Sequence, residues 1–150
     1  MVSLSNHERN RVGFMWRYLL IALALAGCVQ MPPTPQDLQA RRFESVPDKS
    51  VIYIVRDVLD NDIAATIMLD DSLSITTYPG TYYRWEVAPG KHRLAGFAAD
   101  VGLFTLDTAP GRVYFVEQRL NQLMTFASSR FYLVSEGHAR TVVARSVLVQ

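Results

Sequence analysis

The sequence predicts an all-β sandwich followed by a short C-terminal helix. From Lys49 onward the chain consists of short apolar runs, rich in β-branched and aromatic residues, that Gly, Pro and Asp separate. This pattern is typical of strands joined by tight turns. One run, Thr81–Val87, alternates between apolar and polar side chains, as a strand with one buried face does. About seven or eight such strands over roughly 100 residues suffice for two packed sheets without disulfides.

The first 27 residues have the pattern of a secretory signal peptide. An apolar stretch, Tyr18–Ala26, follows a positively charged segment. Its nine residues are too few to cross a bilayer, which takes about 20, but they fit the core of a signal. Met15 is an alternative start inside this segment. The positive charges come from Arg9, Arg11 and Arg17.

The chain has one cysteine, Cys28, directly behind the apolar stretch. The residues Leu25-Ala26-Gly27-Cys28 resemble the lipobox of bacterial lipoproteins. In that motif a leucine and two small residues let a dedicated peptidase reach the bond before a lipid-modified cysteine. The motif predicts cleavage after Gly27 and attachment to a membrane through an acylated Cys28.

Other roles of Cys28 fit its surroundings less well. A disulfide within the chain needs a second cysteine, and there is none. A nucleophilic thiol needs a nearby histidine or a helix N-terminus to lower its pKa, whereas the nearest histidines are His7, within the signal, and His92. A buried structural cysteine is the remaining alternative. The order of charge, apolar run, small residues and cysteine favours lipid attachment.

The segment from Cys28 to residue 48 is expected to be a lipidated cysteine and a tether. Val29–Asp48 contains four prolines and few apolar side chains, without hydrophobic periodicity. Leu38–Phe43 is expected to add no more than one helical turn. The folded domain is then expected over residues 49–150.

The charge balance argues against nucleic acid as a partner. Of 15 basic and 14 acidic residues, three arginines and Glu8 precede Cys28, so the mature chain is nearly neutral. Nucleic-acid binding needs a basic stripe.

The domain begins with a strand, Ser50–Arg56, that is apolar on both faces, as a central strand covered on both sides would be. Tight turns are expected at Pro89-Gly90 and Pro110-Gly111, because proline and glycine suit a type II turn. Ser135 is expected to cap the C-terminal helix in "EGHARTVVARS". The other expected strands are Ala64–Asp70, Leu73–Thr76, Lys91–Phe97, Leu103–Asp107, Arg112–Gln118 and Phe131–Val134.

The strand Thr81–Val87 supplies the candidate interaction surface. Its apolar face consists of Tyr83, Trp85 and Val87, which predicts a buried indole. Tyr and Arg are enriched at protein interfaces, and the opposite face is expected to be exposed. That face, the candidate interaction surface, consists of Tyr82, Arg84 and Glu86.

The order of these stretches resembles a bacterial lipoprotein family known only as the domain of unknown function two-eight-four-six. The resemblance covers about Lys49–Gln118 and rests on "VIYIVR", "LDD", "GTYYRWEVAPGKHRL" and "APGRVYFVEQ". It implies an envelope-anchored domain with an immunoglobulin-like or transthyretin-like sandwich. It implies no reaction, because the family has none assigned.

The sequence offers little catalytic chemistry. His92 is expected to point inward beside a turn, and His138 to lie on the face of the terminal helix; no two histidines have metal-ligand spacing. Phosphate-loop, nucleophile-elbow and HExxH motifs are missing. We therefore expect no metal, no cofactor and no enzymatic activity. The best carboxylate group, expected to lie in solvated turns rather than around calcium, is Asp57, Asp60, Asp62, Asp70 and Asp71.

The leading functional hypothesis is a lipoprotein that presents a non-enzymatic sandwich to a protein partner in the bacterial envelope. Val29 follows the cysteine where an aspartate would retain a lipoprotein in the inner membrane, so in a diderm source the outer membrane, facing the periplasm, is expected. The alternative is a domain that binds a small ligand or an envelope glycan. It requires Tyr82, Tyr83 and Trp85 to line one groove.

Overall fold

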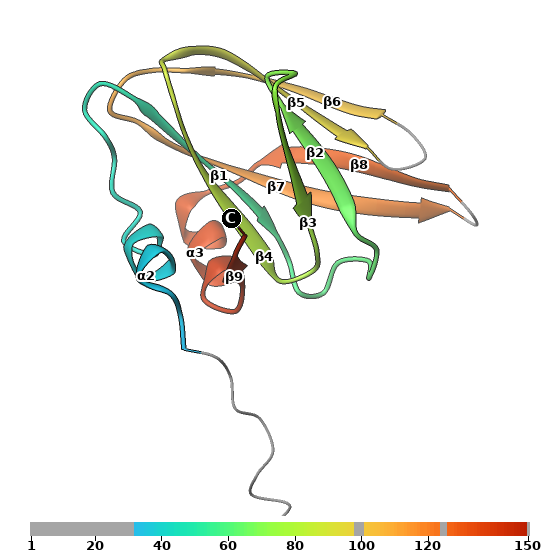
Figure 1. The fold of residues 1–150 in the computed structure, drawn as a ribbon. Coiled ribbons are helices and arrows are strands. Elements are labelled where there is room, and N and C mark those ends of the chain that lie inside the picture. Colours follow the sequence, from blue (N-terminus) through green and yellow to red (C-terminus); the bar gives the residue numbers. More distant parts are fainter. Residues whose placement is uncertain (1–31, 98–100, 124–125, 150) are drawn as a thin grey trace, which may run out of the picture. The chain divides into compact units, whose positions relative to one another are not determined.

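The computed structural model describes residues 32–97, 101–123 and 126–149. Within these ranges the chain forms two packed sheets, and two short helices lie against one of them (Figure 1). The all-β sandwich with a short C-terminal helix is therefore confirmed. The predicted signal peptide, the lipobox and Cys28 lie outside the described residues.

The strands follow the predicted order, with two extensions and one addition. The hairpin of β7 and β8 is longer than expected, because its polar residues continue the ladder. The short β9 was not expected. The strands are β1 (Ser50–Arg56), β2 (Ala65–Leu69), β3 (Leu73–Thr77), β4 (Thr81–Val87), β5 (Gly90–Phe97), β6 (Val101–Thr108), β7 (Val113–Leu123), β8 (Phe126–Leu133) and β9 (Val147–Leu148). The helices are α2 (Pro35–Ala40) and α3 (Glu136–Val143).

The first sheet has the order β8-β7-β1-β4-β9, and the second has the order β3-β2-β5-β6. At the centre of the first sheet, β1 pairs antiparallel with β4 and parallel with β7. Ile52 thus lies between Trp85 and Tyr114. The edge strand β9 pairs with Thr81 and Tyr82, and no described strand pairs with this edge of β4 beyond Tyr82, which is called the free edge of β4 below.

One of the two expected type II turns has the expected backbone. Gly111 has φ 68°, which is close to the value that the third residue of such a turn requires. Gly90 has φ 141° and already belongs to β5, so the expectation is wrong there. The φ of Gly90 is nevertheless one that residues with a Cβ rarely adopt.

The main core lies between the two sheets. Trp85 is only 8% exposed, which confirms its predicted orientation. Its ring meets the His92 ring edge-on, with centroids 5.2 Å apart. The buried residues of this core are Ile52, Ile54, Ile67, Leu69, Ile75, Trp85, Leu94, Leu106, Val116 and Phe131.

A second core covers the outer face of the first sheet. Both faces of β1 are consequently buried, as its sequence predicts. The two helices lie over this face, and Ser135 caps α3 as expected, accepting a hydrogen bond from the His138 amide at 3.3 Å. The buried residues of the second core are Ala40, Val51, Tyr53, Val55, Tyr82, Phe115, Ala139, Val142 and Val143.

The expected tether is wrong for its described part, since residues 33–48 belong to the domain. The compact unit begins at Pro33 rather than at residue 49. Arg41 donates to the carbonyl oxygens of Val143, at 2.9 Å, and Ser146, at 2.6 Å. Tyr53 Oη donates to the Ala40 carbonyl at 2.6 Å. These contacts join residues too far apart in the chain for periodicity to show them.

Among the described residues, no helix has the length and hydropathy that a membrane crossing requires.

Candidate functional site

Tyr82, the first residue of the candidate interaction surface, is completely buried. The expectation that it is exposed is wrong. Its hydroxyl donates to the Asp37 carboxylate of α2, and Asp37 also accepts from Arg41 Nε at 2.9 Å. Burial, followed by the hydrogen bond to Asp37, raises the pKa of Tyr82. Tyr82 therefore holds α2 on the sheet and is not free for a partner.

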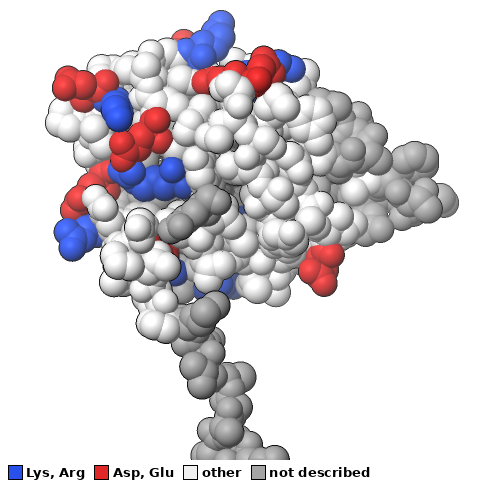
Figure 2. Space-filling view, in the orientation of Figure 1, with Lys and Arg blue, Asp and Glu red and all other residues white. Residues whose placement is uncertain are grey.

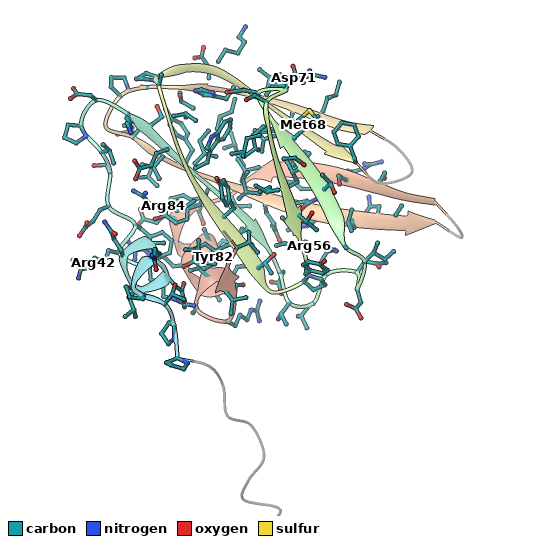
Figure 3. The ribbon with its side chains drawn as sticks, in the orientation of Figure 1. Arg42, Arg56, Met68, Asp71, Tyr82 and Arg84 are labelled. Carbon is teal, nitrogen blue, oxygen red and sulfur yellow. The ribbon has the colours of Figure 1, made fainter. Side chains whose placement is uncertain are left out.

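Arg84 lies on the same covered face as Tyr82, with 19% of its side chain exposed. Its Nε donates to Tyr53 Oη at 3.2 Å, and its Nη2 donates to the Glu44 carbonyl at 3.4 Å. In Figure 3 both Tyr82 and Arg84 lie on the side of β4 that faces α2. Arg84 thus joins the segment after α2 to the sheet.

Glu86 forms an ionic cluster with Arg84 and Lys49 near the free edge of β4. It pairs with Arg84 and, at 3.6 Å, with Lys49 Nζ. The hydrogen bond from Arg84 lowers the pKa of Glu86, against the opposing effect of burial. Burial works to lower the pKa of Arg84, but its bonds to Glu86 and Tyr53 outweigh burial and raise it. Burial also raises the pKa of Tyr53.

Glu86→Gln should reduce stability at neutral pH and have a smaller effect in strong acid. The folded pKa of Glu86 is depressed, so its stabilisation is complete above its ordinary pKa and is lost as the pH falls through the folded value. Urea unfolding of both proteins across the acid range measures this. A difference in the free energy of unfolding that stays constant into strong acid would show that Glu86 does not act through its charge.

An open pocket of about 320 Å³ lies between α2, β4 and β9. Gln36 and Gln39 of α2 contribute to its wall, opposite Arg84 and Leu148. The guanidinium of Arg84 already donates to Tyr53, Glu86 and Glu44. Arg84 is therefore engaged in the fold, and the other polar side chains that line the pocket are Gln36, Gln39 and Tyr83.

The three aromatic residues of β4 do not form one groove. Tyr82 belongs to the core under the helices, whereas Trp85 belongs to the core between the sheets. Tyr83 packs against the Trp85 side and is only partly buried. The shared ring surface that the glycan-binding alternative requires is thus not made by these residues.

His92 points inward beside the turn, as the sequence predicts. Its Nδ1 lies 2.7 Å from Asp70 Oδ2, and its Nε2 lies 2.7 Å from the Ala88 carbonyl oxygen. Both ring nitrogens are thereby engaged, and the ring closes one end of the main core against Trp85. His138 lies exposed on α3, with Nε2 3.2 Å from Glu117.

The acidic residues that the sequence groups together are held in separate contacts. Asp57 pairs with Arg145 at 2.6 Å, and Asp71 pairs with Arg93 at 2.6 Å. Asp60 pairs with Arg56 at 2.7 Å. In the described ranges, no three His, Cys, Asp or Glu side chains come together as metal ligands would.

Three residues important to the fold are not among those predicted from the sequence: Asp37 and Arg41, which hold the helix layer, and the buried Arg56. A signal for the first two exists. Thr34 caps α2 by accepting from the Asp37 amide at 3.1 Å, and Pro35 occupies the first turn. This pairing of cap and proline is a recognised helix start. For Arg56, an arginine that ends an apolar strand gives no such signal.

No protein-family model matches the chain, and no curated protein matches it either. The resemblance to the lipoprotein family remains a prediction from the residues that carry it.

Proposed function

We propose that the protein is a lipoprotein of the bacterial envelope that presents a non-enzymatic β-sandwich as a structural or interaction module. The observation that carries this proposal is the order of charged segment, short apolar stretch and Leu25-Ala26-Gly27-Cys28. Each acyl chain of about 15 methylenes adds on the order of 10 kcal/mol of membrane affinity. Two chains on Cys28 therefore anchor the protein stably.

The position of the fold in the chain supports this reading. The compact unit begins at Pro33, five residues after Cys28. A cysteine so close to the first residue of a domain, but outside it, suits attachment to a lipid better than a place in a core.

The engagement of the buried polar side chains supports a structural role. Arg56 is bound to Asp60 and to two backbone carbonyls. Gln118 of β7 joins the two sheets by accepting from Thr77 Oγ1 of β3 at 2.6 Å, and it donates to Ser129 Oγ of the neighbouring β8 at 3.1 Å. The hydrogen bonds of these side chains connect parts of the domain to one another.

We also propose that the protein is related to the lipoprotein family that its sequence resembles, and that it is sorted to a particular membrane. The residue after the cysteine is Val29, which favours the outer membrane of a diderm cell, facing the periplasm. The partner we propose is another envelope protein.

Cys28→Ser should abolish incorporation of radioactive palmitate and leave the precursor uncleaved, because the acyl acceptor is lost. The measurement is metabolic labelling followed by gel separation of precursor and mature chain. Ser45→Ala, an exposed change in the described domain, serves as the matched control and should be labelled normally. Palmitate labelling that survives Cys28→Ser would refute lipid attachment at this residue.

A further inference from the structure

Exposed apolar and aromatic side chains gather at the end of the sandwich where the described chain begins. Leu59 is 82% exposed in the loop after β1. Figure 1 shows that this loop, the turn after β3, β9 and α2 all lie at the lower end of the view. The exposed large side chains of these segments, here called the apolar end, are Leu38, Val58, Leu59, Tyr78 and Val147.

Contacts around Gly80 show that these segments are neighbours. A Cβ built on Gly80 would lie 3.6 Å from the Val58 side chain and 3.8 Å from the Arg145 carbonyl oxygen. The Val147 amide donates to the Gly80 carbonyl at 2.9 Å. Tyr78 precedes Gly80 in the same turn, where the Thr81 amide donates to the Tyr78 carbonyl at 3.2 Å. Val58, Tyr78 and Val147 therefore lie together.

The helix α2 borders the same end. Arg41 of the segment after α2 donates to the carbonyl of Ser146, the residue before Val147. Tyr82, two residues after Gly80, donates to Asp37 of α2. Leu38 is exposed on α2. The first residues of the domain and the apolar end are thus parts of one surface.

The charges at this end are partly neutralised. Asp57 pairs with Arg145, and Asp60 is bound to the buried Arg56. Figure 2 shows most charged side chains along the top and left of the view, and a lower end that is largely uncharged apart from one acidic group and a few partly covered basic atoms. Asp62 is exposed in the same loop as Leu59, which limits any lipid contact to a shallow one.

The segment between Cys28 and the domain, even when fully extended, is shorter than the diameter of the domain. Four residues, 29–32, separate Cys28 from Pro33, and an extended chain spans at most about 3.6 Å per residue. The Cα atoms of Cys28 and Pro33 are therefore within about 18 Å of each other. A domain of this size has a radius of gyration of about 13 Å, so its diameter exceeds the reach of the link.

We propose that the apolar end rests on the bilayer that holds Cys28, with Leu59 and Val58 at its tip and Tyr78 and Val147 beside them. This inference rests on the proposed lipid anchor. Leucine and valine suit the hydrocarbon boundary, and tyrosine suits the headgroup level. The opposite end, with the turn after β2, faces away from the membrane and is the part available to a soluble partner.

The test uses the lipidated full chain in phosphatidylethanolamine and phosphatidylglycerol vesicles. Leu59→Cys carries a nitroxide, and Leu103→Cys on β6, where the leucine is 61% exposed, is the matched control. Acylation blocks Cys28, so each introduced thiol is the single labelling site. Collision rates with oxygen and with a water-soluble nickel chelate are then measured by electron paramagnetic resonance.

At position 59 we expect a loss of collisions with the nickel chelate and a gain with oxygen, relative to position 103. Mass spectrometry of the N-terminal peptide from the same samples reports acylation. If the chain is acylated and position 59 is as accessible to the chelate as position 103, the membrane contact is wrong and the anchor stands. If Cys28 is not acylated, the proposed function fails and this inference falls with it.

Discussion

Replacing Trp85 by alanine is expected to lower the free energy of unfolding by about 3–5 kcal/mol, because it removes a buried aromatic and leaves a cavity. Trp85 lies between the sheets against the His92 ring, so His92 also loses a packing partner. Urea or guanidinium unfolding of the domain from Pro33 onward measures the change. The boundary matters, since a protein that starts at residue 49 would lack α2.

The control for Trp85→Ala is Thr105→Ala, an exposed change on β6 with an expected effect within about 0.5 kcal/mol. Arg84→Ala does not serve as a neutral control, although the exposed position that the sequence predicts for Arg84 would make it one. Arg84 bonds to Tyr53 and Glu44, so we expect its loss to cost about 1–2 kcal/mol. A Trp85→Ala effect no larger than that of Thr105→Ala would contradict the burial of the indole.

Arg56→Met should cost about 3–5 kcal/mol, because removal of one partner leaves a poorly solvated charge behind. Arg56 has no exposed surface and lies where β1 passes into the following loop (Figure 3). Its Nε donates to Asp60 at 2.7 Å and its Nη1 to the Thr77 carbonyl at 3.1 Å. Asp60 in turn accepts from the Leu120 amide at 3.2 Å. Methionine keeps most of the apolar stem but satisfies none of these groups.

Arg93→Met is the matched control for Arg56→Met. Arg93 pairs with Asp71 at 2.6 Å, but both side chains are well exposed, and exposed ion pairs contribute about 0–1 kcal/mol. Denaturant unfolding of the two variants at neutral pH gives the comparison. Equal losses would mean that burial of Arg56 adds nothing to its ion pair.

The sandwich follows from side-chain alternation, which is a local property of the chain. Alternation in β4 placed Trp85 inward correctly, and the doubly apolar β1 was correctly placed at the centre of a sheet covered on both sides. The predicted exposure of the Tyr82 face of β4 is wrong. Because β4 is the neighbour of β1, the layer that covers Tyr53 extends over Tyr82 as well.

The position of α2 over the first sheet is only weakly indicated by the sequence. The helix α2 has only six residues and is held largely by polar contacts, such as those of Arg41 with Val143 and Ser146. Hydrophobic periodicity does not register such contacts. The predicted exposure of the candidate interaction surface is wrong for the same reason, because the exposure of a strand face depends on segments that are distant in the chain.

The central place of β1 makes the first sheet depend on contacts between distant parts of the chain. Its partners β4 and β7 come much later in the sequence, and the β7 pairing is parallel. Loops must close before such contacts form, so folds of high contact order mature over milliseconds to seconds rather than microseconds. For a chain that is threaded through a membrane, as we propose, the first sheet cannot be completed until β7 has emerged.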